Sequence, residues 1–478
     1  MPTRATKIVA TLGPASRDPA MLEAMIRAGV NVVRLNFSHG KAQDHIDLAK
    51  LVREAATRAG REVAIMADLQ GPKIRVGKFA EGKVMLEPGA KFVLDASRAE
   101  PGDLTGVGLD YKELPRDVKA GDVLLLNDGL IVLTVDSVQG EKVNTTVKLG
   151  GELSNNKGIN KQGGGLTAPA LTAKDMEDIK TAMSFQADYL AVSFPKNATD
   201  MEMARQLANV AAAQYNHKPG LIAKIERAEA IPRLEEILLA SDGIMVARGD
   251  LGVELPVQAV PPIQKQLVRK CKQARIPVII ATQMMETMID SLTPTRAEVN
   301  DVANSVMDGA DAVMLSGETS VGKYPVQVIE TMSRILRSVE DADSIQVPAE
   351  APSVKTKRFV TKSVCYHAVV MAKDIEAKSL QLLTNSGFTA YQVSACRPSC
   401  HILVFTSNKR ILSQLNLLWG VKAFFYDKRE STDQTIADLN QIGKDQGILN
   451  SGDYTITLTS MPLKEKGMVN SLKVTEII

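Results

Sequence analysis

The feature that most constrains this chain is a regular alternation of short apolar stretches with longer amphipathic ones. The short stretches have the length and aliphatic content of buried parallel strands, and several end in a polar residue. The longer ones repeat apolar positions with the period of a helix. This alternation favours a closed (β/α)8 (TIM) barrel over an open sheet. The expected barrel strands are Ile8–Thr11, Val32–Asn36, Val63–Asp68, Tyr189–Ser193, Leu221–Glu226, Gly243–Arg248, Val278–Thr282 and Ala312–Ser316.

The helical period is lost between about residues 71 and 169, where Gly, Asp and short alternating runs predict a small all-β domain inserted into the barrel. It leaves and rejoins at the strand ends, so it is placed to act as a lid. A Ser/Ala/Pro stretch at Ala349–Ser353 predicts a linker to an open α/β domain. The expected division is barrel 1–70 and 170–345, lid 71–169, and C-terminal domain 346–478. Helices are expected at Pro19–Ala28, Ala42–Ala59, Thr199–Tyr215 and Val257–Ala274, with capping boxes at Thr295 and Thr172.

Charge and composition exclude several classes of protein. The 478 residues include 57 Lys and Arg against 55 Asp and Glu, and only 4% are aromatic. Without a basic excess or stacking side chains, the chain is not expected to bind nucleic acid. No apolar run approaches the ~20 residues that span a bilayer, and Met1–Ala5 lead into a strand without a signal-like block. We expect a cytoplasmic protein without membrane contact.

Three expected strands end in residues that suggest chemistry. Lys224 and Glu226 are two residues apart and project to the same side of a strand, and Asp250 follows the next strand. Two carboxylates without a third protein ligand suit Mg²⁺, and Lys224 can reach a phosphoryl oxygen. Thr282 can orient water or a proton. The alternative is a purely structural ion network, although buried charge is costly and gathers at functional sites.

A second group of polar residues is expected on the same rim. Arg34 and Asn36 share a face of the second strand, Ser38 opens the following loop, and Asp68 ends the third strand. Arg75 lies where the chain leaves for the lid. Two arginines on one rim can hold phosphate oxygens by bidentate contacts, whereas each alone would be an ordinary surface residue.

In the C-terminal domain, hydroxyl residues and a glycine follow a strand and open a helix. These residues are Thr384, Asn385, Ser386, Gly387 and Thr389. Such a turn can cradle an anion, and a plain capped turn is an equally good interpretation from physics alone.

Taken together, these residues resemble the pyruvate kinase family over nearly the whole length, lid and C-terminal domain included. The matching stretches are Lys7–Pro14, Asn36–Gly40, Lys224–Glu226, Met245–Gly252, Ala281–Met284, Pro294–Glu298 and Leu315–Thr319. The resemblance implies Mg²⁺-dependent phosphoryl transfer from phosphoenolpyruvate to ADP, which gives pyruvate and ATP in the last step of glycolysis. Mn²⁺ can replace Mg²⁺ in such a site.

The resemblance also implies roles for the matching residues. Lys224 would stabilise the transferring phosphoryl group and the enolate oxygen, and Glu226 and Asp250 would hold the divalent ion. The backbone at Gly249 and Asp250, with Thr282, would bind the substrate carboxylate. Thr282 would also help to protonate the enolate through water.

Further roles follow from the same resemblance. Ser316 and Glu318 are possible members of a proton relay, and Arg34 and Arg75 would grip phosphates. The nucleotide side would be formed by Asn36, His39, Arg75 and Lys157.

One departure from the family pattern concerns K⁺. Much of the family uses K⁺ near Asn36, Ser38 and Asp68, with a glutamate in the segment that follows. Here Lys73 occupies the glutamate position, and its ammonium can supply the missing charge. The segment also matches the K⁺-independent branch at Leu69, Gln70 and Val76. We therefore predict that K⁺ is not required.

The turn at residues 384–389 corresponds to the family's effector site, which implies a phosphorylated activator. Phe388 stands where fructose-bisphosphate-regulated relatives often carry arginine, and a second effector loop near Pro462–Asn470 also differs. We expect a sugar monophosphate or AMP instead. The family implies a homotetramer.

Two other functions remain open at this point. A Mg²⁺-dependent carbon–carbon lyase acting on pyruvate or phosphoenolpyruvate would share the carboxylate pair but would need neither the lid nor the two arginines. A catalytically silent sensor of sugar phosphates would not need Lys224, Glu226, Asp250 and Thr282 intact.

Overall fold

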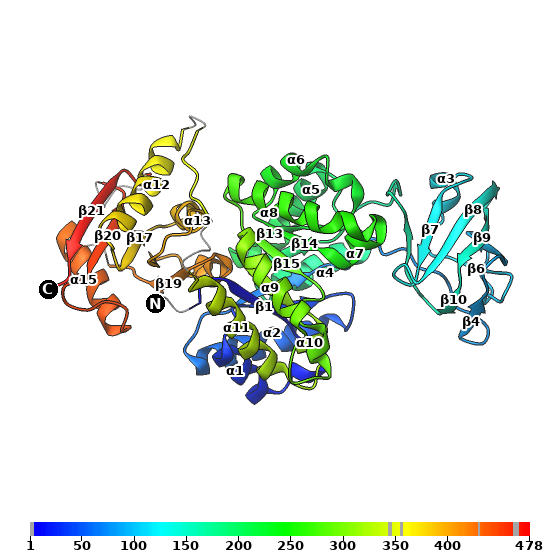
Figure 1. The fold of residues 1–478 in the computed structure, drawn as a ribbon, viewed down its shortest axis with the longest axis horizontal. Helices are drawn as coiled ribbons and strands as arrows, with labels where there is room; N and C mark the ends of the chain where they lie inside the picture. The colour runs from blue at the N-terminus through cyan, green and yellow to red at the C-terminus, as the bar shows by residue number, and fades with distance from the viewer. Residues whose placement is uncertain (1–3, 343–346, 354–356, 429–430, 462–467) are drawn as a thin grey trace.

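The computed structural model describes residues 4–342, 347–353, 357–428, 431–461 and 468–478. It has three parts in a row (Figure 1): a barrel in the middle, a small β part on one side and an α/β part on the other.

The central part is a closed barrel of parallel strands in the order β1-β2-β3-β12-β13-β14-β15-β16, as predicted. Several strands end one residue earlier than the apolar pattern suggested, so their polar residues begin the following loops. The strands are β1 Lys7–Thr11, β2 Val32–Asn36, β3 Ala64–Asp68, β12 Tyr189–Val192, β13 Gly220–Ile225, β14 Gly243–Ala247, β15 Val278–Ala281 and β16 Ala312–Leu315.

Helices with one apolar stripe surround the barrel and bury that stripe against the strands. The expected capping boxes at Thr295–Glu298 and Thr172–Asp175 are both present. The surrounding helices are α1 Pro19–Ala28, α2 Ala42–Ala59, α4 Ala173–Ser184, α5 Ala198–Ala212, α6 Leu234–Ala240, α8 Val260–Ala274, α9 Arg296–Asp308 and α11 Pro325–Glu340. Two short helices follow strand ends, α7 Arg248–Glu254 and α10 Gly317–Ser320.

The barrel interior is filled by side chains from alternate strand positions, among them Met66, Tyr189 and Met245. Leu417, from the C-terminal domain, joins this interior cluster. The Tyr189 hydroxyl donates a hydrogen bond of 2.7 Å to the Gln414 carbonyl. The C-terminal domain therefore closes the end of the barrel where the strands begin, which leaves the opposite end for chemistry.

The β part, called the lid here, has its own apolar core and two sheets, one of six strands and one of two. A short helix, α3 Leu114–Asp117, interrupts the all-β pattern that the sequence predicted. The strands are β4 Lys83–Leu86, β5 Lys91–Asp95, β6 Gly106–Gly108, β7 Val123–Leu126, β8 Ile131–Gln139, β9 Lys142–Leu149, β10 Gly151–Ser154 and β11 Ile159–Lys161.

The C-terminal part is an open α/β sheet with strand order β19-β18-β17-β20-β21. The antiparallel edge strand β21 was not expected from the sequence. The strands are β17 Ser379–Leu383, β18 His401–Thr406, β19 Val421–Phe425, β20 Tyr454–Thr459 and β21 Ser471–Glu476. The helices are α12 Phe359–Asp374, α13 Phe388–Ala395, α14 Lys409–Gln414 and α15 Thr432–Asp445.

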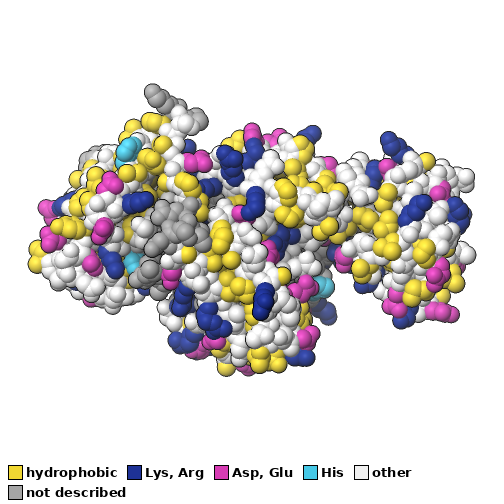
Figure 2. Space-filling model, in the orientation of Figure 1, with side chains coloured by type: hydrophobic (Ala, Val, Ile, Leu, Met, Phe, Trp, Pro, Cys, Tyr) yellow, Lys and Arg dark blue, Asp and Glu magenta, His cyan; other side chains and the backbone are white. Residues whose placement is uncertain are grey.

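Basic and acidic side chains are interspersed over the face shown in Figure 2, consistent with the net charge of +2. Among the described residues, no helix combines the length and apolar character that crossing a bilayer requires.

Candidate active site

Lys224, on β13, is the centre of the charged residues where the barrel strands end. Its Nζ lies 2.9 Å from Glu226 Oε1 and 3.1 Å from Asp68 Oδ1, and it donates a hydrogen bond of 2.8 Å to Ser193 Oγ. Burial alone would lower the pKa of Lys224, but the carboxylates of Asp68 and Glu226 outweigh burial and raise the pKa above its ordinary value. The ammonium is therefore a permanent, poorly solvated positive charge.

Asp68, at the end of β3, links Lys224 to Arg34 on the neighbouring strand β2. Arg34 Nε lies 2.6 Å from Asp68 Oδ2, and Arg34 also donates to Thr11 Oγ1 at 3.2 Å. Burial alone would raise the pKa of Asp68, but the charges of Arg34 and Lys224 lower it. Oδ1 is within ion-pair distance of Lys224 but receives no hydrogen bond of good geometry, so it retains capacity for a further cation or donor.

Glu226 and Asp250 are the two acids predicted to hold a metal. Asp250 lies in α7 and not at the end of a strand, because the chain turns into a helix directly after β14. Glu226 is 1% exposed and its Oε2 accepts from the Phe194 amide at 2.8 Å. Burial raises the pKa of Glu226 to about 7, because Lys224 offsets only part of the effect and the Asp250 charge adds to it. Lys224 therefore offsets only part of the negative charge that Glu226 and Asp250 bring together.

These two acids fit a hard divalent cation. Among the described residues there is no group of three or more His, Cys, Asp or Glu side chains that could enclose a metal. Two carboxylates that leave most coordination positions to water and substrate oxygens are what Mg²⁺ accepts. A cation there would add to the positive charge that Lys224 gives to these two carboxylates.

Thr282 directly follows β15 and has a left-handed backbone, with φ of 69°. This conformation is strained for a β-branched residue. Its Oγ1 accepts from the Gly249 amide at 3.0 Å and donates to the Ala281 carbonyl at 2.7 Å. Arg248 braces the turn by donating to the Thr282 carbonyl at 2.6 Å and to the Ala281 carbonyl at 3.2 Å. Thr282 and Gly249 are therefore held together by a direct hydrogen bond.

Glu318 lies behind this turn and is 2% exposed. Its carboxylate accepts from the amides of Ser316 at 2.6 Å and Met285 at 3.1 Å. Burial raises the pKa of Glu318. The structure therefore joins the predicted relay residues to each other and to the segment that carries Thr282.

The residues predicted to contact nucleotide fall into two groups. Asn36 and His39 lie on the barrel rim, where Asn36 Oδ1 accepts from the Ser38 amide at 3.1 Å. Arg75 and Lys157 lie at the root of the lid, where Arg75 pairs with Gly158 in an isolated bridge and the Lys157 carbonyl accepts from Val76. Arg75 also donates to the Asn156 carbonyl at 2.9 Å. Arg34 and Arg75 thus belong to different parts of the fold and not to a single rim.

Lys73 belongs to the lid root as well, since its side chain packs against Gly158. Leu69, the other residue expected near the monovalent-cation region, is buried, and its carbonyl accepts a hydrogen bond of 2.7 Å from Ser193 Oγ. Ser193 therefore connects Lys224 to the segment after β3.

The predicted effector turn lies between β17 and α13. Thr384 Oγ1 accepts from the Gly387 amide at 3.1 Å, and Gly387 has φ of 78°. The Asn385 carbonyl accepts from Asn408, and Thr389 Oγ1 is buried without a hydrogen-bond partner. Ser386 Oγ is 3.5 Å from the Phe388 amide. Most of the second predicted loop, residues 462–467, lies outside the described residues.

Comparisons with known proteins agree with this geometry. Residues 3–329 match the family model described as pyruvate kinase, barrel domain, and residues 362–475 match pyruvate kinase, alpha/beta domain. The chain belongs to the pyruvate kinase family. The family assignment, the fold class and the prediction of a phosphotransferase are therefore confirmed.

Relatives within the pyruvate kinase family match over nearly the full length. Pyruvate kinase II of Salmonella typhimurium is 46% identical over 476 residues and covers 98% of both chains. A pyruvate kinase of Mycobacterium tuberculosis is 41% identical over 475 residues, 99% of both. The crystal structure of a pyruvate kinase from Cryptosporidium parvum superposes with a TM-score of 0.93 at 32% identity, covering 100% of this chain and 97% of the other.

In this pyruvate kinase fold, the sequence analysis missed three residues that support the site. Ser193 receives a hydrogen bond from Lys224, Arg248 braces Thr282, and Asp301 pairs with Arg248 at 2.7 Å. Ser193 and Arg248 each come directly after a barrel strand, so their positions were a usable signal. Asp301 lies inside α9, where no local pattern distinguishes it from a surface acid.

Proposed function

We propose that this chain transfers the phosphoryl group of phosphoenolpyruvate to ADP and releases pyruvate and ATP, in the last step of glycolysis. The observation that supports this most directly is Lys224, a buried ammonium within 3.1 Å of two carboxylates at the end of the barrel where the strands finish. A fixed positive charge in a water-poor site stabilises charge that develops on phosphoryl oxygens.

In this reaction the bond between phosphorus and the enol oxygen breaks, and a terminal oxygen of ADP bonds to phosphorus. Lys224 neutralises the phosphoryl oxygens and the enolate oxygen as charge moves between them. Arg34, on β2, pairs with Asp68 at 2.6 Å and binds phosphoryl oxygens with its remaining donors. The chain's contribution is placement of charge, which is what phosphoryl transfer requires.

Glu226 and Asp250 would hold Mg²⁺, or Mn²⁺ in its place. Such an ion, when bound, neutralises phosphate oxygens and orients them. The amides of Gly249 and Asp250 with the Thr282 hydroxyl would bind the substrate carboxylate. The Gly249 amide donates to Thr282 Oγ1 at 3.0 Å and the Thr282 hydroxyl donates to the Ala281 carbonyl at 2.7 Å, so the two groups lie side by side and would exchange these hydrogen bonds for the carboxylate.

The enolate then takes a proton on its methylene carbon to become pyruvate. Thr282, through water, would guide this proton, with Ser316 and the buried Glu318 as relay members. The nucleotide would lie between the barrel rim, at Asn36 and His39, and the lid root, at Arg75 and Lys157, so we propose that lid movement brings the two groups together.

The test is an assay that couples pyruvate formation to ADP and phosphoenolpyruvate, for the wild type and Lys224→Met. We expect Lys224→Met to lower kcat by about 10²–10³-fold or more, because it removes a transition-state charge. Lys218→Met, an exposed position shortly before β13, is the matched control. Pyruvate formation that does not depend on ADP, or a Lys224→Met enzyme as active as the control, would exclude this function.

We further propose that turnover does not require K⁺. Asp68 already faces two protein cations, Arg34 and Lys224, and Lys73 on the lid root adds a positive charge to the segment that follows β3. The wild type should turn over in buffer whose only monovalent cation is tetramethylammonium, and Lys73→Glu should create a dependence on K⁺. Lys78→Glu, exposed on the lid, is the control. Loss of wild-type turnover without K⁺ would refute the proposal.

The turn at Thr384–Thr389 supports a proposal of allosteric activation by a phosphorylated metabolite, a sugar monophosphate or AMP. Its hydroxyls and the glycine at φ of 78° form a concave turn without an acidic side chain. Thr384→Ala with Ser386→Ala should abolish activation, and Ser399→Ala, exposed in the same domain, should retain it. Activation that survives the double substitution would discard this site.

We also propose that the protein is a cytoplasmic homotetramer. Within each chain, the domain boundaries would lie at residues 70/71, 169/170 and 345/346. Sedimentation velocity tests the assembly, and limited proteolysis tests the division.

A further inference from the structure

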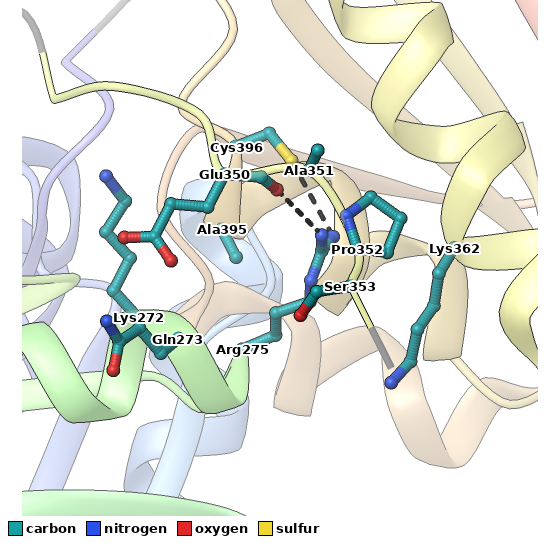
Figure 3. A pocket seen from close by; sticks show the side chains of 10 residues that line it. All are labelled: Lys272, Gln273, Arg275, Glu350, Ala351, Pro352, Ser353, Lys362, Ala395 and Cys396. Carbon is teal, nitrogen blue, oxygen red and sulfur yellow. Dashed lines mark hydrogen bonds between the residues drawn. The ribbon is translucent and has the colours of Figure 1, made fainter. Parts of the chain in front are cut away.

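A cavity of about 370 Å³ lies between the barrel and the C-terminal domain (Figure 3). Its polar lining comes from the end of α8, the linker and α12, and includes Lys272, Arg275, Glu350, Ser353 and Lys362. The end of α8 leads into the start of β15, so the cavity is at the opposite end of the barrel from the active site. Its volume is within the range of about 300–1,000 Å³ usual for small-molecule sites.

Positive charge exceeds negative charge in this lining. The lining contains three cationic residues, Lys272, Arg275 and Lys362, and one acidic residue, Glu350. The Lys272 ammonium donates to the Pro348 carbonyl, a neutral partner. Burial lowers the pKa of Lys272, and the like charge of Arg397 lowers it further. Lys362 makes no hydrogen bond to the other residues drawn in Figure 3.

Arg275 joins the segments around the cavity. It ends α8 with a left-handed backbone, φ of 59°, a position that usually favours glycine. Its guanidinium donates to the Gln392 carbonyl at 3.1 Å and to the Glu350 carbonyl at 3.2 Å, and lies 3.7 Å from Cys396 Sγ. Two of these contacts are dashed in Figure 3. All three acceptors are uncharged, so these contacts leave the positive charge of Arg275 in place.

We propose that this cavity binds a small phosphomonoester metabolite, whose dianion is held by the remaining donors of Arg275. The ammonium groups of Lys272 and Lys362 lie on opposite sides of Arg275 in Figure 3, so they attract the dianion by their charge and do not both close on one phosphate group. Phosphate suits a guanidinium with flanking ammonium groups. The volume leaves room for a polar body beside Ser353 and Gln273. The ligand would contact the barrel, the linker and the C-terminal domain at once, and would therefore couple their positions. The site is separate from the turn at residues 384–389 and does not depend on its role.

The chain contains a natural reporter for this site. Trp419 is its only tryptophan, and the Arg397 guanidinium lies 4.9 Å over its ring. Arg397 lines a small hollow that shares Lys272, Arg275 and Ala395 with the cavity. Charge entering the cavity is therefore expected to alter the fluorescence of Trp419.

The experiment titrates glycerol 3-phosphate and inorganic phosphate into full-length protein that carries Thr384→Ala and Ser386→Ala, without divalent ions or nucleotide. Binding is followed by Trp419 fluorescence and by calorimetry at constant ionic strength. In this background, Lys272→Gln with Lys362→Gln should weaken glycerol 3-phosphate binding about tenfold or more. Lys362→Gln alone, which removes no hydrogen bond drawn in Figure 3, should weaken it severalfold.

The matched control is Lys270→Gln, which removes the same charge from α8 at a residue paired with Glu235. It should bind like the parent, and glycerol 3-phosphate should bind more tightly than inorganic phosphate. The proposal is overturned by equal affinity in the Lys272/Lys362 variant and the Lys270 control, or by the absence of saturable binding in the parent.

Discussion

The end of the barrel and the effector turn of the C-terminal domain both face anions in the proposed function, but they are built differently. At the barrel end, Asp68 on β3 pairs directly with Arg34 on the neighbouring strand β2 and with Lys224 on β13, two strands away, and the side chains of Asp68 and Lys224 are buried. The turn after β17 uses hydroxyls and backbone amides, such as Thr384 with Gly387. Removing a charge from a buried ion pair lowers the free energy of unfolding strongly. Removing a hydroxyl from a neutral turn lowers it much less. This contrast suits a reaction site and a regulatory site respectively.

The substitution Asp68→Asn is expected to have the largest effect, and it tests whether the barrel end depends on its buried ion pairs. This substitution removes the carboxylate that lies between Arg34 and Lys224, although Lys224 keeps its pair with Glu226. Removing one partner of a buried ion pair costs about 3 kcal/mol or more. We expect a comparable loss of stability and a fall in kcat/KM of about 10²-fold or more, measured by denaturant unfolding and steady-state kinetics. The control is Asp136→Asn, whose pair with Lys91 on the lid surface is screened by solvent and should contribute little to stability. Equal effects of the two substitutions would contradict the contrast.

Glu254 is a second buried acid that can be compared with Asp68, because its hydrogen bond comes from a backbone amide and not from a cation. Its Oε2 accepts from the Ala228 amide at 3.0 Å, and burial raises its pKa to about 7, with Glu229 adding to the effect. Since the unfolded chain releases this proton near the ordinary value of 4.5, stability is fully present below that pH and is lost as pH rises through about 7.

Glu254→Gln should therefore be more stable than the wild type at pH 8, by about 2 kcal/mol, and the gain should vanish toward pH 4.5. Thermal unfolding across this range measures the difference. Glu152→Gln, on the lid surface, should show no such trend. A gain that is independent of pH would mean that Glu254 is not the titrating group.

Arg248→Lys tests how far the reaction site depends on bracing. The variant keeps a charge for Asp301 but loses the fork that reaches the Ala281 and Thr282 carbonyls. We expect kcat to fall about tenfold with little change in KM for ADP. Solvent-deuterium exchange into pyruvate should fall in parallel, because Thr282 would guide that proton.

The control for this bracing is Arg205→Lys, which disturbs a similar fork to Ala240 and Asp242 away from the site. A purely structural role of Arg248 would lower the melting temperature without reducing deuterium exchange.

The smallest effect is expected in the effector turn. Thr384→Ala removes one hydrogen bond to the Gly387 amide and should lower stability by about 0.5–1 kcal/mol. Differential scanning calorimetry of Thr384→Ala and of Thr57→Ala, a helix surface control, measures this loss. A loss as large as that of Asp68→Asn would mean that the turn is not the easily altered region described here.

Much of the fold was predictable because local patterns coincide with the final elements. The helices α1 and α2 begin and end where the apolar period and flanking residues predicted. The ranges 199–215 and 257–274 each join an α-helix to a 3-10 turn, which shares the helical spacing and is not separable by pattern. The edge strand β21 was missed because its side chains are largely exposed and lack an apolar run.

The sequence alone determined the barrel, the inserted lid and the polar residues at strand ends. These features follow from the spacing of apolar and polar residues along the chain, which is a local property. Only the tertiary structure decided that Asp68 lies between Arg34 and Lys224, that Asp301 holds Arg248, and that the Arg75 guanidinium is held by the Asn156 carbonyl. The reason is that charge interactions depend on separation and solvent exposure. Barrel closure sets both quantities for residues far apart in the chain.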